Sequence, residues 1–67
     1  SVYPNPTTSF LNVSFNKEFS GSICDFTGKK LLSFSTKTVD LSQLASGIYV
    51  LDVISEDKRY TKKIIKQ

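Results

Sequence analysis

The sequence predicts a small all-β fold, an antiparallel β-sandwich of six to seven strands. Short segments rich in β-branched and aromatic residues recur at intervals of roughly 8–12 residues, with turn-forming residues between them. No segment has the length and periodicity of a long helix. The chain has 67 residues, of which 39% are hydrophobic, so it can form one small core in a single domain and is not of a disordered type.

The segment Ser1–Ser9 is predicted to form a stiff N-terminal arm. Pro4 and Pro6 fix their own φ angles, and they hold Tyr3 and Asn5, the residues before them, in extended geometry. Asn5 can also hydrogen-bond to nearby main chain and close a turn. Residues 2–3 of this arm are the candidate for a short seventh strand at a sheet edge.

The next two strands are predicted at residues 11–15 and 21–25. Apolar and polar residues alternate in the first of them, so that Leu11, Val13 and Phe15 would face the core. Residues 16–20 form a polar connection in which Phe19 supplies the one apolar contact. The second strand runs into a turn.

Asp25–Gly28 is predicted to be a hairpin turn, because Asp is favoured at the first position of a turn. Gly28 can adopt the left-handed conformation that closes a turn with a bulge. The return strand is expected at residues 31–35, followed by a turn at 36–37 and a short strand at 38–41. Asp40 is expected to cap a single turn around residues 42–45.

The strand Ile48–Ile54 is predicted to be the central and most buried one, and the chain is organised around it. Its apolar run follows Gly47 and is interrupted only by Asp52. Alternation places Tyr49, Leu51 and Val53 on one face, and both faces are mostly apolar, as in a strand covered on both sides. Asp52 is therefore expected near an edge or beside a lysine.

Residues 55–59 are predicted to form a polar hairpin loop, and residues 60–66 form the last strand. The formal net charge is +3, but the last ten residues hold five basic and no acidic side chains. Two interpretations of this basic strand stay open. Its lysines could protect a solvated sheet edge from aggregation, or they could attract an anionic partner.

The residues required for most catalytic sites are missing. The chain has no histidine, so it cannot form a catalytic triad, a Cys–His dyad or an imidazole metal site. Its one thiol, Cys24, can form neither an internal disulfide nor a zinc site, and we expect an inert, partly buried side chain. No run of about 18 apolar residues could span a membrane. We therefore expect no enzymatic activity, no cofactor, no metal and no membrane insertion.

Four motifs, in this order, resemble a known family. They are Val2-Tyr3-Pro4-Asn5-Pro6, Asp25-Phe26-Thr27-Gly28-Lys29, the block from Val39 to Leu51, and Lys62-Lys63-Ile64-Ile65-Lys66. Together they resemble the type A C-terminal sorting domain of the type IX secretion system, or Por secretion system, of Bacteroidota. Each motif alone is weak, but the resemblance runs almost from end to end. The chain departs from the pattern at Gly21, where the family often has a branched apolar residue.

The resemblance implies an immunoglobulin-like sandwich that acts as a secretion signal. Residues 1–67 would be a single C-terminal sorting domain, a fragment of a larger secreted precursor with an N-terminal cargo domain. The precursor would cross the periplasm in transit and reach the cell surface or the medium through the outer-membrane translocon. A sortase-like cysteine peptidase would remove the domain upstream of Ser1, and the cargo would be released or attached to anionic lipopolysaccharide.

The expected site residues fall into two groups. Recognition by the translocon would involve the last strand, where an edge can accept a partner strand and lysines add charge complementarity. The residues of this group are Lys62, Lys63, Ile65 and Lys66. The second group shapes the family motifs and comprises Tyr3, Pro4, Asn5, Pro6, Asp25, Gly28, Lys29, Leu44, Gly47 and Tyr49. An open edge would also allow a weak dimer.

Two other functions are compatible with a small β-sandwich. An accessory sandwich that binds carbohydrate or protein for a parent secreted enzyme would need exposed aromatic side chains, such as a row of Tyr3, Tyr49 and Tyr60. A nucleic-acid-binding barrel would need aromatic residues interleaved with basic ones on one face. Only Tyr60 with Lys62 and Lys63 fits that pattern locally, so no nucleic acid is expected as a partner.

Overall fold

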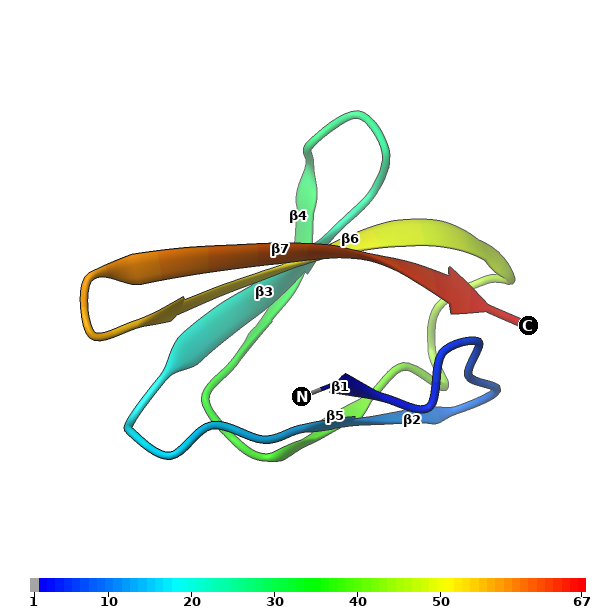
Figure 1. Ribbon diagram of the computed structural model, residues 1–67. Coiled ribbons are helices and arrows are strands. Elements are labelled where there is room, and N and C mark those ends of the chain that lie inside the picture. Colours follow the sequence, from blue (N-terminus) through cyan, green and yellow to red (C-terminus); the bar gives the residue numbers. More distant parts are fainter. Residues whose placement is uncertain (1) are drawn as a thin grey trace.

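The computed structural model describes residues 2–67, which fold into seven strands in two antiparallel sheets (Figure 1). Ser1, where the predicted arm begins, lies outside the described residues. The two sheets lie over each other as layers, with β1, β2 and β5 in one and the remaining strands in the other (Figure 1). This confirms the predicted all-β sandwich, and two facing antiparallel sheets are the architecture of immunoglobulin-like domains.

The smaller sheet has the strand order β1-β2-β5. Its strands are β1 (Val2–Tyr3), β2 (Phe10–Val13) and β5 (Thr38–Asp40). The register pairs Val2 with Val13 and Leu11 with Val39. β2 ends at Val13, earlier than predicted, so Phe15 packs against the edge of the core from a loop.

The larger sheet has the order β4-β3-β6-β7. Its strands are β3 (Ser20–Cys24), β4 (Lys30–Phe34), β6 (Gly47–Ser55) and β7 (Lys58–Lys66). β6 lies inside the sheet and pairs with β7 from Gly47 opposite Lys66 to Ser55 opposite Lys58. The central position predicted for this strand is confirmed, and β7 is an edge strand.

The core lies between the two sheets and draws on both of them. Its buried members are Leu11, Val13, Ile23, Val39, Leu41, Tyr49, Leu51, Val53 and Ile64, each at most 9% exposed. Burying one such aliphatic side chain contributes about 1.5–3 kcal/mol, which is large for a domain of this size. The single face of β6 that carries Tyr49, Leu51 and Val53 therefore holds the sandwich together.

The prediction that both faces of β6 are buried is wrong. On its outer face Ile48 and Ile54 are 52% and 51% exposed, and Val50 and Asp52 are half-buried. The smaller sheet covers only the inner face of the larger one, and the described residues form no third layer. The apolar residues on both faces correctly predicted that β6 is an interior strand of its sheet. They wrongly predicted that a second layer covers its outer face.

The loop between β6 and β7 is tighter than the predicted loop at residues 55–59. Ser55 pairs with Lys58, so only Glu56 and Asp57 form the turn. Their φ angles are +53° and +63°. Positive φ at both central residues is the geometry of a type I′ turn, which matches the twist of the strands it joins.

Gly21 makes room for an aromatic ring at the start of β3. It lies opposite Phe34 of β4, and a Cβ atom at position 21 would be 2.5 Å from Phe34 Cζ and 3.0 Å from the Asp52 carbonyl oxygen. The Phe34 ring thus occupies the space that a side chain at position 21 would fill.

Candidate functional site

The N-terminal arm covers part of the free edge of β7. The Asn5 side-chain amide Nδ2 donates to the Lys63 carbonyl oxygen at 3.0 Å, and the Ile65 N–H donates to Asn5 Oδ1 at 3.1 Å. Thr7 then forms a parallel bridge beside Lys66, donating to the Ile65 carbonyl and accepting from the Gln67 N–H. The arm therefore satisfies the outward main-chain groups at the C-terminal end of β7.

The edge before the arm is open. In an antiparallel pair, alternate residues direct their main-chain groups away from the partner strand. Ile65 points toward the arm, so Lys63, Thr61 and Arg59 point outward in the same way. Among residues 2–67, no partner outside β6 bonds to the main chain of Arg59 or Thr61. Main-chain donors and acceptors are thus available from Arg59 to the Lys63 N–H.

The four residues predicted for recognition do not share one face. Lys62 and Lys66 lie on the inner side of β7, opposite Leu51 and Gly47 of β6, whereas Lys63 and Ile65 lie on the outer side. Lys62 and Lys63 are exposed, but Lys66 is only 9% exposed. The accessible charge of this group therefore lies at Lys62 and Lys63, beside the open edge.

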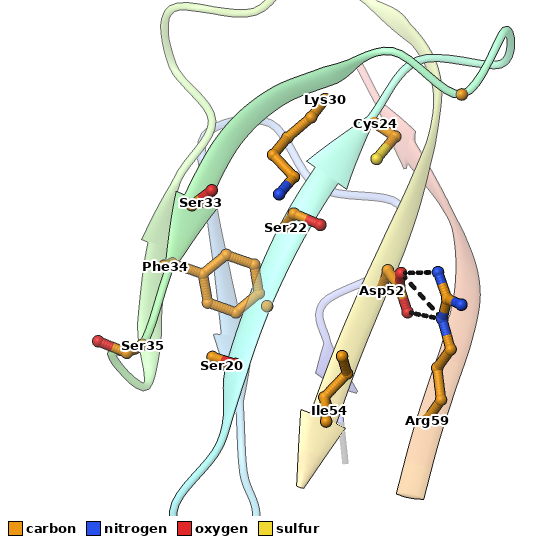
Figure 2. A pocket seen from close by; sticks show the side chains of 12 residues that line it. Ser20, Ser22, Cys24, Lys30, Ser33, Phe34, Ser35, Asp52, Ile54 and Arg59 are labelled. Atoms are coloured by element: carbon orange, nitrogen blue, oxygen red, sulfur yellow. Dashed lines mark hydrogen bonds and ion pairs between the residues drawn. The ribbon is translucent and has the colours of Figure 1, made fainter. Parts of the chain in front are cut away.

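The outer face of the larger sheet carries a polar groove of about 660 Å³ (Figure 2). Figure 2 shows Ser22, Cys24 and Lys30 on strands β3 and β4 beside the ion pair between Asp52 and Arg59. Arg59 Nη2 lies 2.6 Å from Asp52 Oδ2, and Arg59 Nε also donates to the carboxylate.

The ion pair with Arg59 has an electrostatic consequence for Asp52. The hydrogen bond from the guanidinium, with its positive charge, holds the pKa of Asp52 below the usual value for an aspartate. The same pair raises the pKa of Arg59. The sequence predicted that Asp52 lies near an edge or beside a lysine, but the structure places it on the interior strand β6 and pairs it with Arg59, the second residue after the β6–β7 turn. Thus Asp52 keeps the side chain of Arg59 on the outer face.

A rigid turn joins β3 to β4. The Asp25 carboxylate accepts hydrogen bonds from the main-chain N–H groups of Thr27 and Lys29, at 2.9 and 3.0 Å, and from the Thr27 hydroxyl. These bonds, led by that of the hydroxyl, lower the pKa of Asp25. Gly28 has a φ of +93° and donates to the Asp25 carbonyl oxygen, as expected of a left-handed turn residue. At the tip of this turn Phe26 is 83% exposed.

The remaining motif residues shape the start of β6 and the arm. Gly47 begins β6, and the Tyr49 hydroxyl donates to the Ala45 carbonyl oxygen at 2.6 Å from within the core. Leu44 packs against the core from the single turn, where Asp40 accepts from the Ser42 N–H. Tyr3, Pro4 and Pro6 are exposed, and both X-Pro bonds are cis. Because Tyr49 is buried, the three tyrosines form no exposed row.

Sequence reasoning missed two residues of this edge. Thr7 is 2% exposed and bonds to β7, but nothing in a short polar stretch distinguishes a buried threonine from an exposed one. The sequence predicts a loop at Arg59, whose place on β7 depends on the two-residue turn at Glu56 and Asp57. This pair is not one of the glycine-containing or asparagine-containing pairs that mark such turns, so no sequence signal placed Arg59 on the strand.

Within residues 2–67 no group of three or more His, Cys, Asp or Glu side chains could hold a metal ion. The same residues include no helix of the length and hydrophobicity needed to cross a membrane.

The chain matches a known protein family. A family described as "Secretion system C-terminal sorting domain" matches residues 1–67, the whole of the chain. No curated protein matches the chain. The match covers the open edge, the arm and the Asp25 turn alike.

Proposed function

The chain belongs to the family of secretion system C-terminal sorting domains, and we propose that it directs a larger secreted precursor through the type IX outer-membrane translocon. Membership of the family supports a sorting role, contact with the type IX secretion machinery and export to the cell surface or the medium. We propose in addition that residues 1–67 are one domain, preceded by a cargo domain. In this proposal the domain has no catalytic activity of its own.

The finer steps of the route are also proposed. The precursor passes through the periplasm, and a sortase-like cysteine peptidase removes the sorting domain after translocation. The cargo is then released or attached to anionic lipopolysaccharide. These steps need a folded domain with a surface that the machinery can bind, and no reactive group in the chain itself.

The observation that supports this function best is the open basic edge of β7. Exposed Lys62 and Lys63 flank main-chain groups that no residue in the range 2–67 outside β6 occupies. A charged edge speeds encounter with an oppositely charged partner. We propose that Lys62, Lys63 and the exposed side chain of Ile65 contact the translocon. Lys66, also predicted for this contact, would act through the packing of the edge because little of it is accessible.

An export assay tests this function. Residues 1–67 are fused to the C-terminus of a periplasmic fluorescent reporter in a bacterium with a type IX system. We expect the fusion to reach the surface or the medium. The double variant Lys62→Gln/Lys63→Gln should stay largely periplasmic, because it removes two exposed positive charges beside the edge.

The matched control is Lys17→Gln/Lys37→Gln, which removes two exposed lysines that do not belong to β7. It should be exported like the unchanged fusion, and circular dichroism should show the same fold for all three. Retention of the unchanged fusion in the periplasm would contradict the sorting function in that host. Equal export of both double variants would contradict the role of the lysines.

A further inference from the structure

A narrow apolar groove runs beside the open part of the β7 edge. It has a volume of about 300 Å³ and lies between β7 and the strand β1 of the other sheet. Its lining residues are Val2, Phe15, Leu51, Val53, Tyr60, Thr61 and Lys62. The Phe15 and Tyr60 rings pack against each other with their centroids 5.2 Å apart, and the lining core residues Leu51 and Val53 stay buried. The groove is thus an apolar depression over the core, beside the open edge.

The arm covers the other half of the same edge. At the C-terminal end of β7, Asn5 and Thr7 bond to the outward main-chain groups of the edge strand. The chain therefore already uses the edge of β7 to hold an extended segment there. From Arg59 to the Lys63 N–H, the same kind of edge has no such segment among residues 2–67.

A strand added at this position would have a defined side-chain pattern. Alternate side chains of a strand point to opposite faces. On the inner face they would meet Tyr60, Val2, Phe15 and the aliphatic stem of Lys62, so apolar side chains fit there. On the outer face they would lie beside Lys63 and beside Arg59, whose guanidinium is already paired with Asp52. Acidic side chains fit there, chiefly because the charge of Lys63 attracts them from the neighbouring strand.

We propose that the edge Arg59–Lys63 and the adjoining groove bind an extended peptide segment of a partner protein, with alternating acidic and apolar residues, by strand addition. This inference rests on the proposed sorting function, because it supplies the chemistry by which the secretion machinery would hold the domain. The partner segment pairs with about five residues of β7, a usual strand length. The net positive charge of the last strand favours an acidic segment over a basic one.

A peptide-binding experiment tests the proposal independently of export. The 67-residue chain is titrated with the acetylated peptide amide Glu-Val-Glu-Val-Glu-Val-Glu, and shifts of backbone amide signals are followed by NMR. We expect binding that shifts the signals of residues 59–63 and weakens as salt is raised. The same peptide with Lys in place of Glu should not bind.

Backbone methylation separates strand addition from simple charge attraction. Two peptides carry N-methyl groups on the three Val residues or on the inner two Glu residues, and they keep every side chain. Only alternate N–H groups of an added strand face β7. One methylated peptide should therefore lose at least about tenfold in affinity and the other should bind as the parent does. Equal binding of both peptides would overturn strand addition.

Variants of the chain give the reciprocal test. Thr61→Pro removes an N–H that points away from β6, so the strand pairing with β6 is kept. Ser33→Pro is the matched control on β4, the opposite edge of the same sheet, where the pairing pattern directs the Ser33 N–H to solvent. Thr61→Pro should abolish peptide binding, Ser33→Pro should preserve it, and amide spectra should show that both variants fold.

Each remaining outcome overturns the proposal in its own way. No binding at millimolar peptide would overturn it outright. If the chain binds no peptide but self-associates, and Thr61→Pro abolishes the self-association, the edge pairs with a second copy of the chain instead. If a chain extended by its native upstream residues no longer binds the peptide, the upstream segment occupies the groove instead. Normal export of Thr61→Pro would leave the sorting function standing and would overturn the use of this edge in it.

Discussion

At the scale of single residues, Gly21 shows how a neighbour fixes the identity of a side chain. Replacing a strand glycine by alanine usually stabilises a protein, because it lowers the entropy of the unfolded chain. Here the added Cβ would lie 2.5 Å from the Phe34 ring and 3.0 Å from the Asp52 carbonyl oxygen. We expect Gly21→Ala to lower the free energy of unfolding by about 1–3 kcal/mol, as overpacking does. Urea denaturation measures this difference.

A double-mutant cycle with Phe34→Leu provides the control for Gly21. If the ring causes the strain, the effects of the two substitutions should be less than additive, because the smaller side chain leaves space for the new methyl group. Strict additivity would show that the ring is not the cause. A Gly21→Ala variant that is more stable than the parent would contradict the overpacking itself.

The ion pair of Asp52 and Arg59 predicts a pH dependence of stability. The folded state lowers the pKa of Asp52, chiefly through its hydrogen bond with Arg59. The stabilisation by Asp52 is therefore fully present above the pKa of an aspartate in the unfolded chain, which is about 4. It is lost as the pH falls through the lower pKa that Asp52 has in the folded state. Thermal unfolding should show that Asp52→Asn lowers the melting temperature at neutral pH but not in strong acid.

Arg59→Gln is the partner variant for this test. It removes the guanidinium that lowers the pKa of Asp52, so its melting temperature should approach that of the parent over the same acid range. A constant difference between the parent and Asp52→Asn across the whole pH range would show that Asp52 acts by packing rather than by charge.

At the scale of elements, the arm and β7 act as one unit. The Asn5 side chain bonds to β7 as the main chain of a neighbouring strand would. Its amide nitrogen donates to the Lys63 carbonyl oxygen, and its amide oxygen accepts from the Ile65 N–H. We expect Asn5→Ala to destabilise the fold by about 1–2 kcal/mol, since net hydrogen bonds contribute about 0.5–1.5 kcal/mol each. The Ile65 amide should then exchange with solvent hydrogen faster than in the parent, as NMR can measure.

The conservative variant Asn5→Asp keeps the acceptor and removes the donor. It should leave the Ile65 amide protected while still losing the bond to the Lys63 carbonyl. The Thr61 amide lies on the open edge and should exchange equally fast in all three proteins. Unchanged protection of Ile65 in Asn5→Ala would mean that Thr7 alone holds the arm in place.

The elements that the sequence predicted well are those set by local rules. Alternation and turn chemistry located the strands, the Asp25 turn and the cap at Asp40, because these depend on residues close together in the chain. The bond of Asn5 to β7 joins residues that are 60 positions apart in the sequence, and no local pattern predicts it. For the same reason the sequence indicated a basic edge but not which half of it is open.

At the scale of the whole molecule, a covered edge and an open edge coexist on one strand of a very small domain. β7 supplies Ile64 to the core and pairs along all of β6. The arm covers the C-terminal half of its outer edge, and the other half lies beside the apolar groove. A structural role and the proposed recognition role thus fall on the same nine residues. An experiment that removes β7 as a whole therefore cannot separate recognition from stability.

Deletion of residues 58–67 shows why this matters for an export assay. A domain of this size is stable by roughly 3–10 kcal/mol, and loss of a buried Ile64 side chain alone costs about 2–5 kcal/mol. The deletion also leaves β6 without its partner, so we expect the truncated chain to be unfolded and its fusion to stay periplasmic. Circular dichroism of the truncated chain should show no cooperative unfolding transition. If it does unfold cooperatively, retention of its fusion would report lost recognition directly. Otherwise only folded variants such as Lys62→Gln/Lys63→Gln and Thr61→Pro can separate recognition from folding.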